Sequence, residues 1–160
     1  MGAFLKIGDI KGDAEDQEHK DWILVETLSS PIHRTVPNDN KGIGRVRGET
    51  VLGDLVLVRN SDKATPKLAA SCARGDFFPE AEIHFCSQIR GKDDPYLKYK
   101  LTNVLISSHS VSANENGDPM PSEQLTLSFT NIEWTWVEFD RHNGDKLGNH
   151  VDSFALTVNK

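Results

Sequence analysis

The sequence lacks any long apolar run. No stretch approaches the roughly 20 apolar residues that a membrane-spanning helix needs. The N-terminal segment Met1–Lys6 also lacks the basic region followed by an apolar region that is typical of a Sec-type signal peptide. We therefore expect no membrane insertion. We also expect that any export of this chain uses a route that does not depend on a cleaved leader.

Cysteine is scarce, with only Cys72 and Cys86 in 160 residues. Small secreted scaffolds that depend on disulfides usually carry four or more cysteines. One bridge between the two is an open alternative, but two buried, reduced thiols are the better interpretation. This cysteine usage favours synthesis in a reducing compartment such as the cytoplasm.

Positive charge is also in short supply. Lys and Arg number 18 against 24 Asp and Glu, which gives a net charge of −6. General nucleic-acid binding needs a basic surface to displace counterions from phosphate, so we expect no nucleic-acid partner. The remaining composition, 37% hydrophobic and 26% charged, is that of an ordinary soluble chain. We expect a single domain over residues 1–160.

Motifs for catalysis and metal binding are missing. The six histidines form no H-E-x-x-H pair, and no C-x-x-C, Walker A, G-x-S-x-G or G-x-G-x-x-G motif is present. The acidic residues between positions 13 and 21 lack the ligand spacing of a calcium loop. We therefore expect no catalytic residue, no cofactor and no metal. A hydrolase assembled from scattered acids and histidines stays open as an alternative.

What is present is a period of two, which indicates half-buried β-strands. Ala81–Ile89 and Gln124–Phe129 alternate cleanly, and the apolar phase then shifts before Ile132 and Trp134, which predicts a bulge or bend near Asn131. Strands that curl in this way are typical of barrels and sandwiches. Further strands are expected at Phe4–Ile10, Trp22–Leu28, Thr50–Arg59, Leu97–Ser108 and Asp152–Val158.

One short helix is expected at about 66–74. Thr65 is a suitable N-cap, Pro66 suits the first helical position and Gly75 can adopt the left-handed conformation at the end. Leu68 and Cys72, four residues apart, would share the buried face. The longest stretch without a strand or helix signal runs from about 29 to 48, and loops of that length are usually functional or mobile.

Charge is unevenly distributed between two segments. The basic segment contains Arg34, Lys41, Arg45 and Arg47. The acidic segment contains Asp13, Glu15, Asp16 and Glu18. The two groups either neutralise each other within one subunit or, if subunits assemble into rings, lie on opposite rims and attract the next ring. We regard all eight residues as candidates for ring stacking.

Several segments together resemble the Hcp (haemolysin-coregulated protein) family of type VI secretion systems. The resemblance follows the order of the family over the whole chain, and its segments are Phe4–Gly12, Trp22–Val25, Ser61–Leu68, Cys72–Gly75, Phe78–Pro79, Leu125–Glu133 and Ser153–Val158. It implies a mainly β fold, a compact β-barrel of two packed antiparallel sheets with one short helix (about 66–74) and a long loop (about 29–48).

The resemblance also implies a function. Hcp subunits close into homo-hexameric rings that stack into a tube, which a contractile sheath expels behind a tip spike protein. The tube carries secreted effectors in its lumen, and no catalytic residue or cofactor is associated with this role. By position after the second strand, Ser29 and Ser30 are expected to face the lumen. The protein would reside in the bacterial cytoplasm before firing and reach the extracellular space or a target cell afterwards.

A different class of protein, a monomeric β-barrel that binds a small ligand, stays open as the alternative function. It would need an enclosed apolar pocket inside the barrel.

Overall fold

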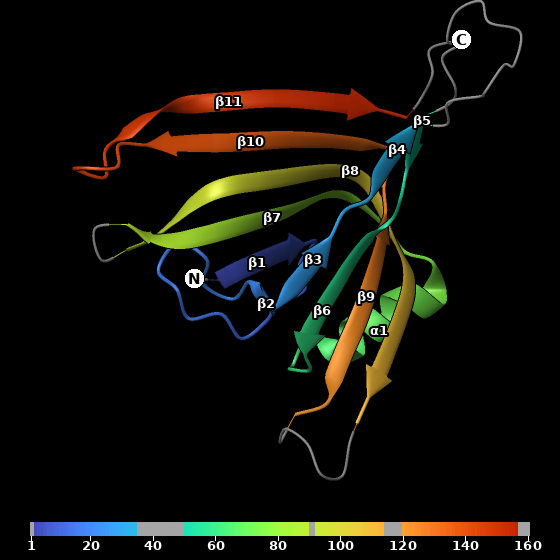
Figure 1. Ribbon diagram of the computed structural model, residues 1–160. Coiled ribbons are helices and arrows are strands. Elements are labelled where there is room, and N and C mark those ends of the chain that lie inside the picture. Colours follow the sequence, from blue (N-terminus) through green and yellow to red (C-terminus); the bar gives the residue numbers. More distant parts are fainter. Residues whose placement is uncertain (1, 35–49, 90–91, 114–119, 157–160) are drawn as a thin grey trace, which may run out of the picture.

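The computed structural model describes residues 2–34, 50–89, 92–113 and 120–156. These residues form eleven strands and one helix (Figure 1). In chain order the elements are β1 (Gly2–Ile7), β2 (Ile23–Val25), β3 (Thr27–Ser29), β4 (Ile32–Arg34), β5 (Thr50–Leu52), β6 (Leu55–Asn60), α1 (Thr65–Arg74), β7 (Phe77–Ile89), β8 (Lys92–Ser112), β9 (Ser122–Ser128), β10 (Asn131–Phe139) and β11 (Lys146–Ala155). The predicted mainly β class is confirmed.

Nine of the described strands form one sheet whose two ends meet on one short chain segment, but β2 and β3 do not pair with each other, so the predicted barrel is not closed by hydrogen bonds. The strands follow the order β2-β1-β7-β8-β9-β6-β3, so the path begins and ends on residues 23–29. The first half of this segment pairs with β1 and the second half pairs with β6. Glu26 lies between the halves, and its N–H donates to the carbonyl of Val58 at 2.9 Å. The predicted strand Trp22–Leu28 is therefore two strands, because the chain changes partner at Glu26.

Strand β8 pairs with three other strands of the nine-stranded sheet. Residues 97–102 pair with β10, whereas residues 105–112 pair with β9, and β7 lies along the opposite side of β8. The change of partner falls at Asn103, whose φ of 53° lies in the left-handed region that Asn tolerates better than most residues. The Thr130 N–H donates to the Thr102 carbonyl at 3.1 Å, and this contact fixes the point where β10 departs. We call Thr102, Asn103 and Thr130 the fork.

The fork also explains the predicted phase shift. Leu125, Leu127 and Phe129 are buried on one side of the break and Ile132 on the other. The break falls at Phe129 and Thr130, next to the predicted position near Asn131, and it separates two strands instead of kinking one.

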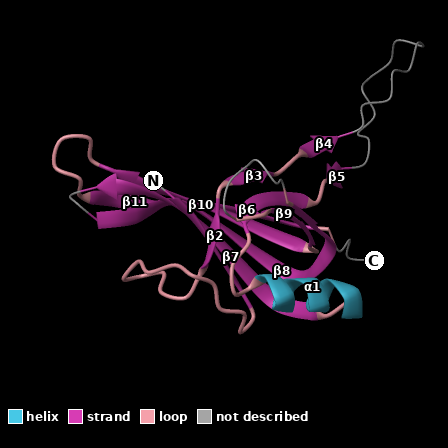
Figure 2. Cartoon of the chain, turned by 90° about the horizontal axis from the view of Figure 1, so that it is seen from below, coloured by secondary structure: helices cyan, strands magenta, loops and turns pink. Residues whose placement is uncertain are grey.

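The core lies on the inner face of the nine-stranded sheet and under the helix. It is built from alternate strand positions such as Leu5, Ile83 and Leu101, all fully buried, with Leu68 inserted from α1. Two segments of the sequence carry apolar residues at consecutive positions, Leu55–Val58 and Val104–Ile106. They lie in β6 and β8, and α1 packs on β8 (Figure 2). Burial of one such aliphatic side chain contributes about 1.5–3 kcal/mol.

The helix begins one residue earlier than predicted. Ala64 occupies the N-cap position without a side-chain cap, so the assignment of Thr65 as N-cap is wrong. The Thr65 hydroxyl instead accepts from the Asp62 N–H at 3.1 Å and donates to Glu123 at 2.7 Å. The end is as predicted, since Gly75 adopts φ 71° and its N–H caps the last turn.

The predicted loop at about 29–48 is wrong over its first residues. Ser29 ends β3, and Ile32–Arg34 forms β4, which pairs with β5. Residues 35–49 lie outside the described part of the chain. The C-terminal strand also starts earlier than predicted, at Lys146 instead of Asp152. Residues 157–160, including the predicted strand end at Val158, again lie outside the described residues.

Both cysteines are thiols in the structure, with Cys86 buried and Cys72 half-buried. In the described part of the chain, no helix has the length and apolar character needed to cross a membrane.

A buried ionic network joins the helix to the barrel. The guanidinium of Arg59, with no exposed side-chain surface, donates to Glu123 Oε2 at 2.8 Å and pairs with Asp62 at 2.5 Å. Glu123 is also fully buried and accepts from Thr65 and contacts His109 Nε2 at 2.8 Å. The network therefore connects β6, β8 and β9 to the start of α1.

We expect Glu123→Ala to destabilise the fold by about 3–5 kcal/mol, because it removes the fully buried carboxylate that pairs with Arg59 and accepts from Thr65. The free energy of unfolding, measured with urea at fixed protein concentration, checks this. The double variant Arg59→Met with Glu123→Leu should lose less than Glu123→Ala, since it removes both charges. The exposed control Glu138→Ala should change the value by less than about 0.5 kcal/mol. Equal losses for Glu123→Ala and Glu138→Ala would contradict the role of the network.

Candidate subunit interface

The β10–β11 hairpin leaves the barrel at the fork and ends in an unpaired edge. Strand β11 pairs with β10 from Ala155 to Lys146 and with no other described strand. All ten of its residues are exposed. In Figure 1 the hairpin lies along the outer side of β8, at the top of the molecule. A strand of this length with unpaired N–H and C=O groups is a ready template for pairing with another chain.

The hairpin turn is rigidly built. The Asp140 N–H donates to the Asp145 carbonyl at 2.8 Å, and the Gly144 N–H donates to the Asp140 carbonyl at 2.9 Å. The Asp140 carboxylate accepts from the His142 N–H at 2.7 Å. Gly144 has φ 74°, a left-handed conformation that suits the Asn143-Gly144 turn signal of the sequence. The turn therefore holds the edge strand in a fixed place.

Large apolar side chains are exposed along this hairpin. They are Trp136 (48% exposed), Leu147, Val151 (57%) and Phe154. Single exposed apolar residues are ordinary on a protein surface, but these four lie on one hairpin beside an unpaired strand. The register places Trp136 and Phe154 on one face of the hairpin and Val151 on the other. Aromatic side chains are enriched at protein–protein contacts. We call β11 with Trp136 the edge surface.

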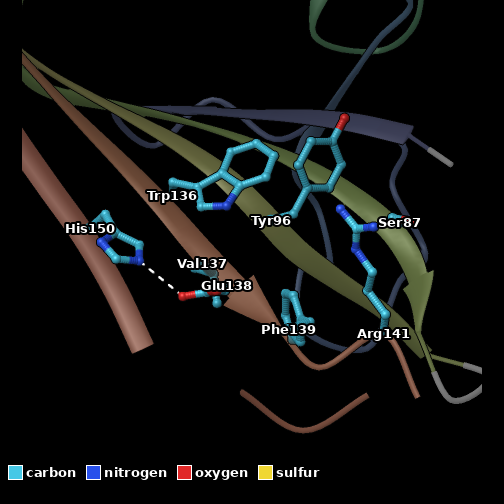
Figure 3. A pocket seen from close by; sticks show the side chains of 8 residues that line it. All are labelled: Ser87, Tyr96, Trp136, Val137, Glu138, Phe139, Arg141 and His150. Atoms are coloured by element: carbon cyan, nitrogen blue, oxygen red, sulfur yellow. Dashed lines mark hydrogen bonds and ion pairs between the residues drawn. The ribbon is translucent and has the colours of Figure 1, made fainter. Parts of the chain in front are cut away.

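A pocket of about 630 Å³ opens at the turn end of the edge surface. Tyr96 and Trp136 form one side of it, with ring centroids 5.6 Å apart in an edge-on arrangement. His150 Nε2 lies 3.1 Å from Glu138 Oε2, and both side chains are well exposed. Figure 3 shows how these side chains, with Ser87, Phe139 and Arg141, surround the space.

The pocket does not assemble a catalytic relay. A serine nucleophile needs its hydroxyl within hydrogen-bond distance of a base. Figure 3 shows Ser87 across the pocket from His150, whose imidazole points to Glu138. Among the described residues, no group of three or more His, Cys, Asp or Glu side chains is arranged to hold a metal ion. Aromatic faces, one guanidinium and an open strand edge are the chemistry of a protein contact.

The family follows from the sequence itself. Residues 4–136 match the family model described as "type VI secretion system effector, Hcp". The chain belongs to the Hcp family. Its predicted resemblance to that family is thereby confirmed.

Relatives and solved structures agree with the Hcp assignment. "Protein hcp1" of Pseudomonas aeruginosa is 30% identical over 130 residues, which cover 81% of this chain and 79% of the relative. The "major exported protein" of the same organism is 24% identical, over 84% of this chain and 78% of its own length. A solved structure of a type six secretion system protein has a TM-score of 0.91 at 26% identity, covering 99% of this chain and 98% of its own. Hcp1 from Salmonella typhimurium has a TM-score of 0.78 at 26% identity, with coverage of 99% and 97%.

The structure places the candidate stacking residues of this Hcp chain only in part. Asp13 contacts Lys63 at 3.7 Å, and Asp16 contacts His19 at 2.6 Å, whereas Glu15 and Glu18 are exposed. Arg34 ends β4 and is exposed, but Lys41, Arg45 and Arg47 lie outside the described residues. Both Figure 1 and Figure 2 place β4 at the opposite side of the molecule from the acidic segment between β1 and β2. The strand that carries Arg34 therefore lies away from the acidic segment.

The candidate lumen residues lie on a different strand from the edge surface. Ser29 is exposed at the end of β3, opposite Val56 of β6, and Ser30 is half-buried next to it. The structure brings neither of them near the pocket at Trp136, which β7, β8, β10 and β11 line.

Sequence reasoning missed the edge surface. Only the second half of β11 carries a strand signal, because Gly148 and Asn149 interrupt the alternation in its first half. Trp136 follows Trp134 in the same phase, so it reads as a core residue although it lies beyond the end of the core. The one usable signal was the strong Asn143-Gly144 turn, which places a second strand directly after β10.

Proposed function

We propose that this Hcp-family chain is the structural subunit of a type VI secretion tube. Six copies close into a ring, the rings stack into a tube, and the tube carries effectors in its lumen when it is exported. The family match supports the secretion role, and the unpaired ten-residue edge of β11 is the observation that supports assembly. The role is structural, with no catalytic residue or cofactor.

The edge surface suits a head-to-tail ring. Such a ring needs two different surfaces on each subunit, one of which presents what the other accepts. Strand β11 offers main-chain donors and acceptors, and Val151 and Leu147 offer apolar area beside them. Added pairing along β11 would remove the unpaired edge without any change in the barrel, because the hairpin leaves the barrel at the fork.

The alternative of a monomeric ligand-binding barrel has less support. The space enclosed by the nine-stranded sheet is filled by the side chains of the core, among them Leu5, Leu57 and Leu127, each fully buried. The pocket of about 630 Å³ lies outside this core, at the end of the β10–β11 hairpin.

Light scattering coupled to size-exclusion chromatography tests the ring. We expect a particle of six times the 17.8 kDa chain mass. Val151→Lys should shift the particle toward the monomer, because a buried ammonium group at the contact would lack a partner. A chain that runs as a clean monomer at micromolar concentration before any substitution would contradict the proposed assembly.

Val111→Lys is the matched control. Val111 is also an exposed strand valine (49%), but it lies in β8, away from the hairpin. It should leave the particle mass unchanged. Equal dissociation by both variants would refute the edge surface as the ring contact and leave the ring itself in place.

Ser29 and Ser30 are proposed to face the lumen and to contact effectors. Replacing each with Trp should reduce the amount of effector that co-purifies with the ring, because a bulky side chain would narrow the passage. Ring mass should stay unchanged, which separates this effect from loss of assembly. Normal effector retention, or loss of the ring, would contradict the lumenal position.

Stacking of rings is proposed to use attraction between the basic group, Arg34, Lys41, Arg45 and Arg47, and the acidic group, Asp13, Glu15, Asp16 and Glu18. Arg45→Glu with Arg47→Glu should weaken filament formation at low salt, as seen by negative-stain electron microscopy, and leave single rings intact. Added salt should weaken filaments of the unmodified chain, since exposed pairs are screened beyond about 8 Å at physiological ionic strength. Unchanged filaments in the double variant would refute this use of the two arginines.

The remaining partners follow from the same proposal. The tube would contact the contractile sheath along its outside and the tip spike protein at its end. We propose that the chain stays in the bacterial cytoplasm until firing and is then secreted without a cleaved signal peptide. The relative described as a major exported protein supports export.

A further inference from the structure

A second, small core lies on the opposite face of the sheet from the main core. Phe4 and His84 are cross-strand partners of β1 and β7, and they alternate with Leu5 and Ile83, which point into the barrel. The segment 9–22 crosses this outer face between β1 and β2. It buries Phe4, Ala14 and Cys86, with Trp22 packed against them. Here the acidic segment is fixed to the barrel.

His19 is the anchor of that segment. Only 1% of the residue is exposed, and its ring stacks on Phe4 with centroids 4.6 Å apart and planes 7° apart. Its Nδ1 donates to Asp16 Oδ2 at 2.6 Å, and its Nε2 lies 2.9 Å from His84 Nδ1. Trp22 meets His19 edge-on and lies 4.7 Å from the ring of His84. The contact between the two imidazoles therefore joins the segment to β7.

Only one hydrogen can lie between the two facing nitrogens, His19 Nε2 and His84 Nδ1. One nitrogen must carry the hydrogen and the other must offer its lone pair. If His19 is neutral, His84 Nδ1–H donates to His19 Nε2; if His19 is charged, the direction reverses and His84 must be neutral. When both imidazoles are charged, two N–H groups and two positive charges face each other at 2.9 Å. The hydrogen bond is then lost.

The surroundings set which imidazole stays neutral. Asp16 faces His19 from the segment itself. From β7, Glu82 lies 3.7 Å from His84 Nε2 and the Cys86 thiol 3.9 Å from His19 Nε2. Lys98 is the cross-strand neighbour of His84 on β8, and Lys6 of β1 lies over Trp22. Burial, then the positive charges of His19 and Lys98, lower the pKa of His84 from 6.5 to about 4.

We propose that the His19–His84 pair is an acid-sensitive latch: charging both imidazoles releases residues 9–22 from the outer face of β1 and β7 while the barrel stays folded. Release uncovers Cys86, which has no exposed surface in the closed form. It also frees a segment that carries six acids against two lysines. The latch does not depend on the proposed tube role, because every group in it belongs to one chain.

The direction of the pH effect follows from the lowered pKa. Once the segment is released, His84 on β7 would return toward its ordinary pKa of 6.5, whereas in the closed form its pKa is about 4. The released form therefore binds more protons between these values, and opening becomes more favourable as the pH falls through that window. Partial solvent access to His84 reduces the full effect, so we expect the opening equilibrium to rise about tenfold to a hundredfold near pH 4.5.

Thiol labelling of the full chain tests the latch. In the Cys72→Ala variant only Cys86 can react, and 4,4′-dithiodipyridine reacts with thiols at acid as well as neutral pH. We expect labelling of Cys86, normalised to glutathione at the same pH, to accelerate about tenfold or more between about pH 7.5 and about pH 4.5. Far-UV circular dichroism should remain that of the folded barrel at both values. Protection of Cys86 that persists at the lower pH, or loss of the whole fold there, would overturn the latch.

A matched pair of variants identifies the group responsible. His84→Asn keeps a polar atom near the Nδ1 position but cannot take up a proton, so Cys86 should stay protected at about pH 4.5. His142→Asn, an exposed histidine in the hairpin turn, should open like the parent. Acid opening that is unchanged in His84→Asn would assign the response to another group and reject the proposal. If Cys86 in the His84→Asn variant is labelled rapidly at both pH values, the same measurement is made on His84→Gln. Acid-dependent labelling of Cys86 in the His84→Gln variant would also reject the proposal.

Discussion

The architecture depends on one constraint, that β8 has to serve two different partners on the same side. Its first half pairs with β10 and its second half with β9, while β7 follows it on the other side. Because the hydrogen-bonding groups on one side of a strand pair with one neighbour at a time, the chain must change partner at the fork, where Asn103 takes a left-handed conformation. The barrel and the β10–β11 hairpin both follow from that change. Strand β9 completes the sheet around the core, and β10 carries β11 with its exposed edge.

Charged groups appear in two contrasting roles in this small β-protein. Arg59 and Glu123 are fully buried but paired, and they hold the helix start to three strands. Such a pair adds little net stability over apolar side chains of similar size, but it penalises any arrangement that separates its members. His19 and His84 are held instead in a contact that survives only while they share one proton.

The sequence predicts the fold class well and the assembly surface poorly. Clean alternation in β7 and β9 and the Gly75 helix end are local signals that the structure preserves. The split at Glu26 and the early helix start at Thr65 escaped prediction, because both depend on partners distant in sequence, Val58 for one and Glu123 for the other. Likewise, His19 and His84 are 65 residues apart, and nothing in either neighbourhood indicates that they meet. Exposure of Trp136 is decided by where the core ends, which periodicity does not reveal.

The unpaired edge of β11 has a consequence for how subunits would come together. In the proposed ring, every open chain of subunits, however long, keeps one bare strand edge at its end, and only closure removes it. The last contact therefore forms without the loss of translational freedom that each earlier addition cost, so closed rings should dominate over partial ones. These open chains of subunits are also the species most prone to wrong pairing, since each exposes the same unpaired strand edge to the β-strands of other proteins. Rapid closure of the ring would therefore limit wrong pairing of this edge.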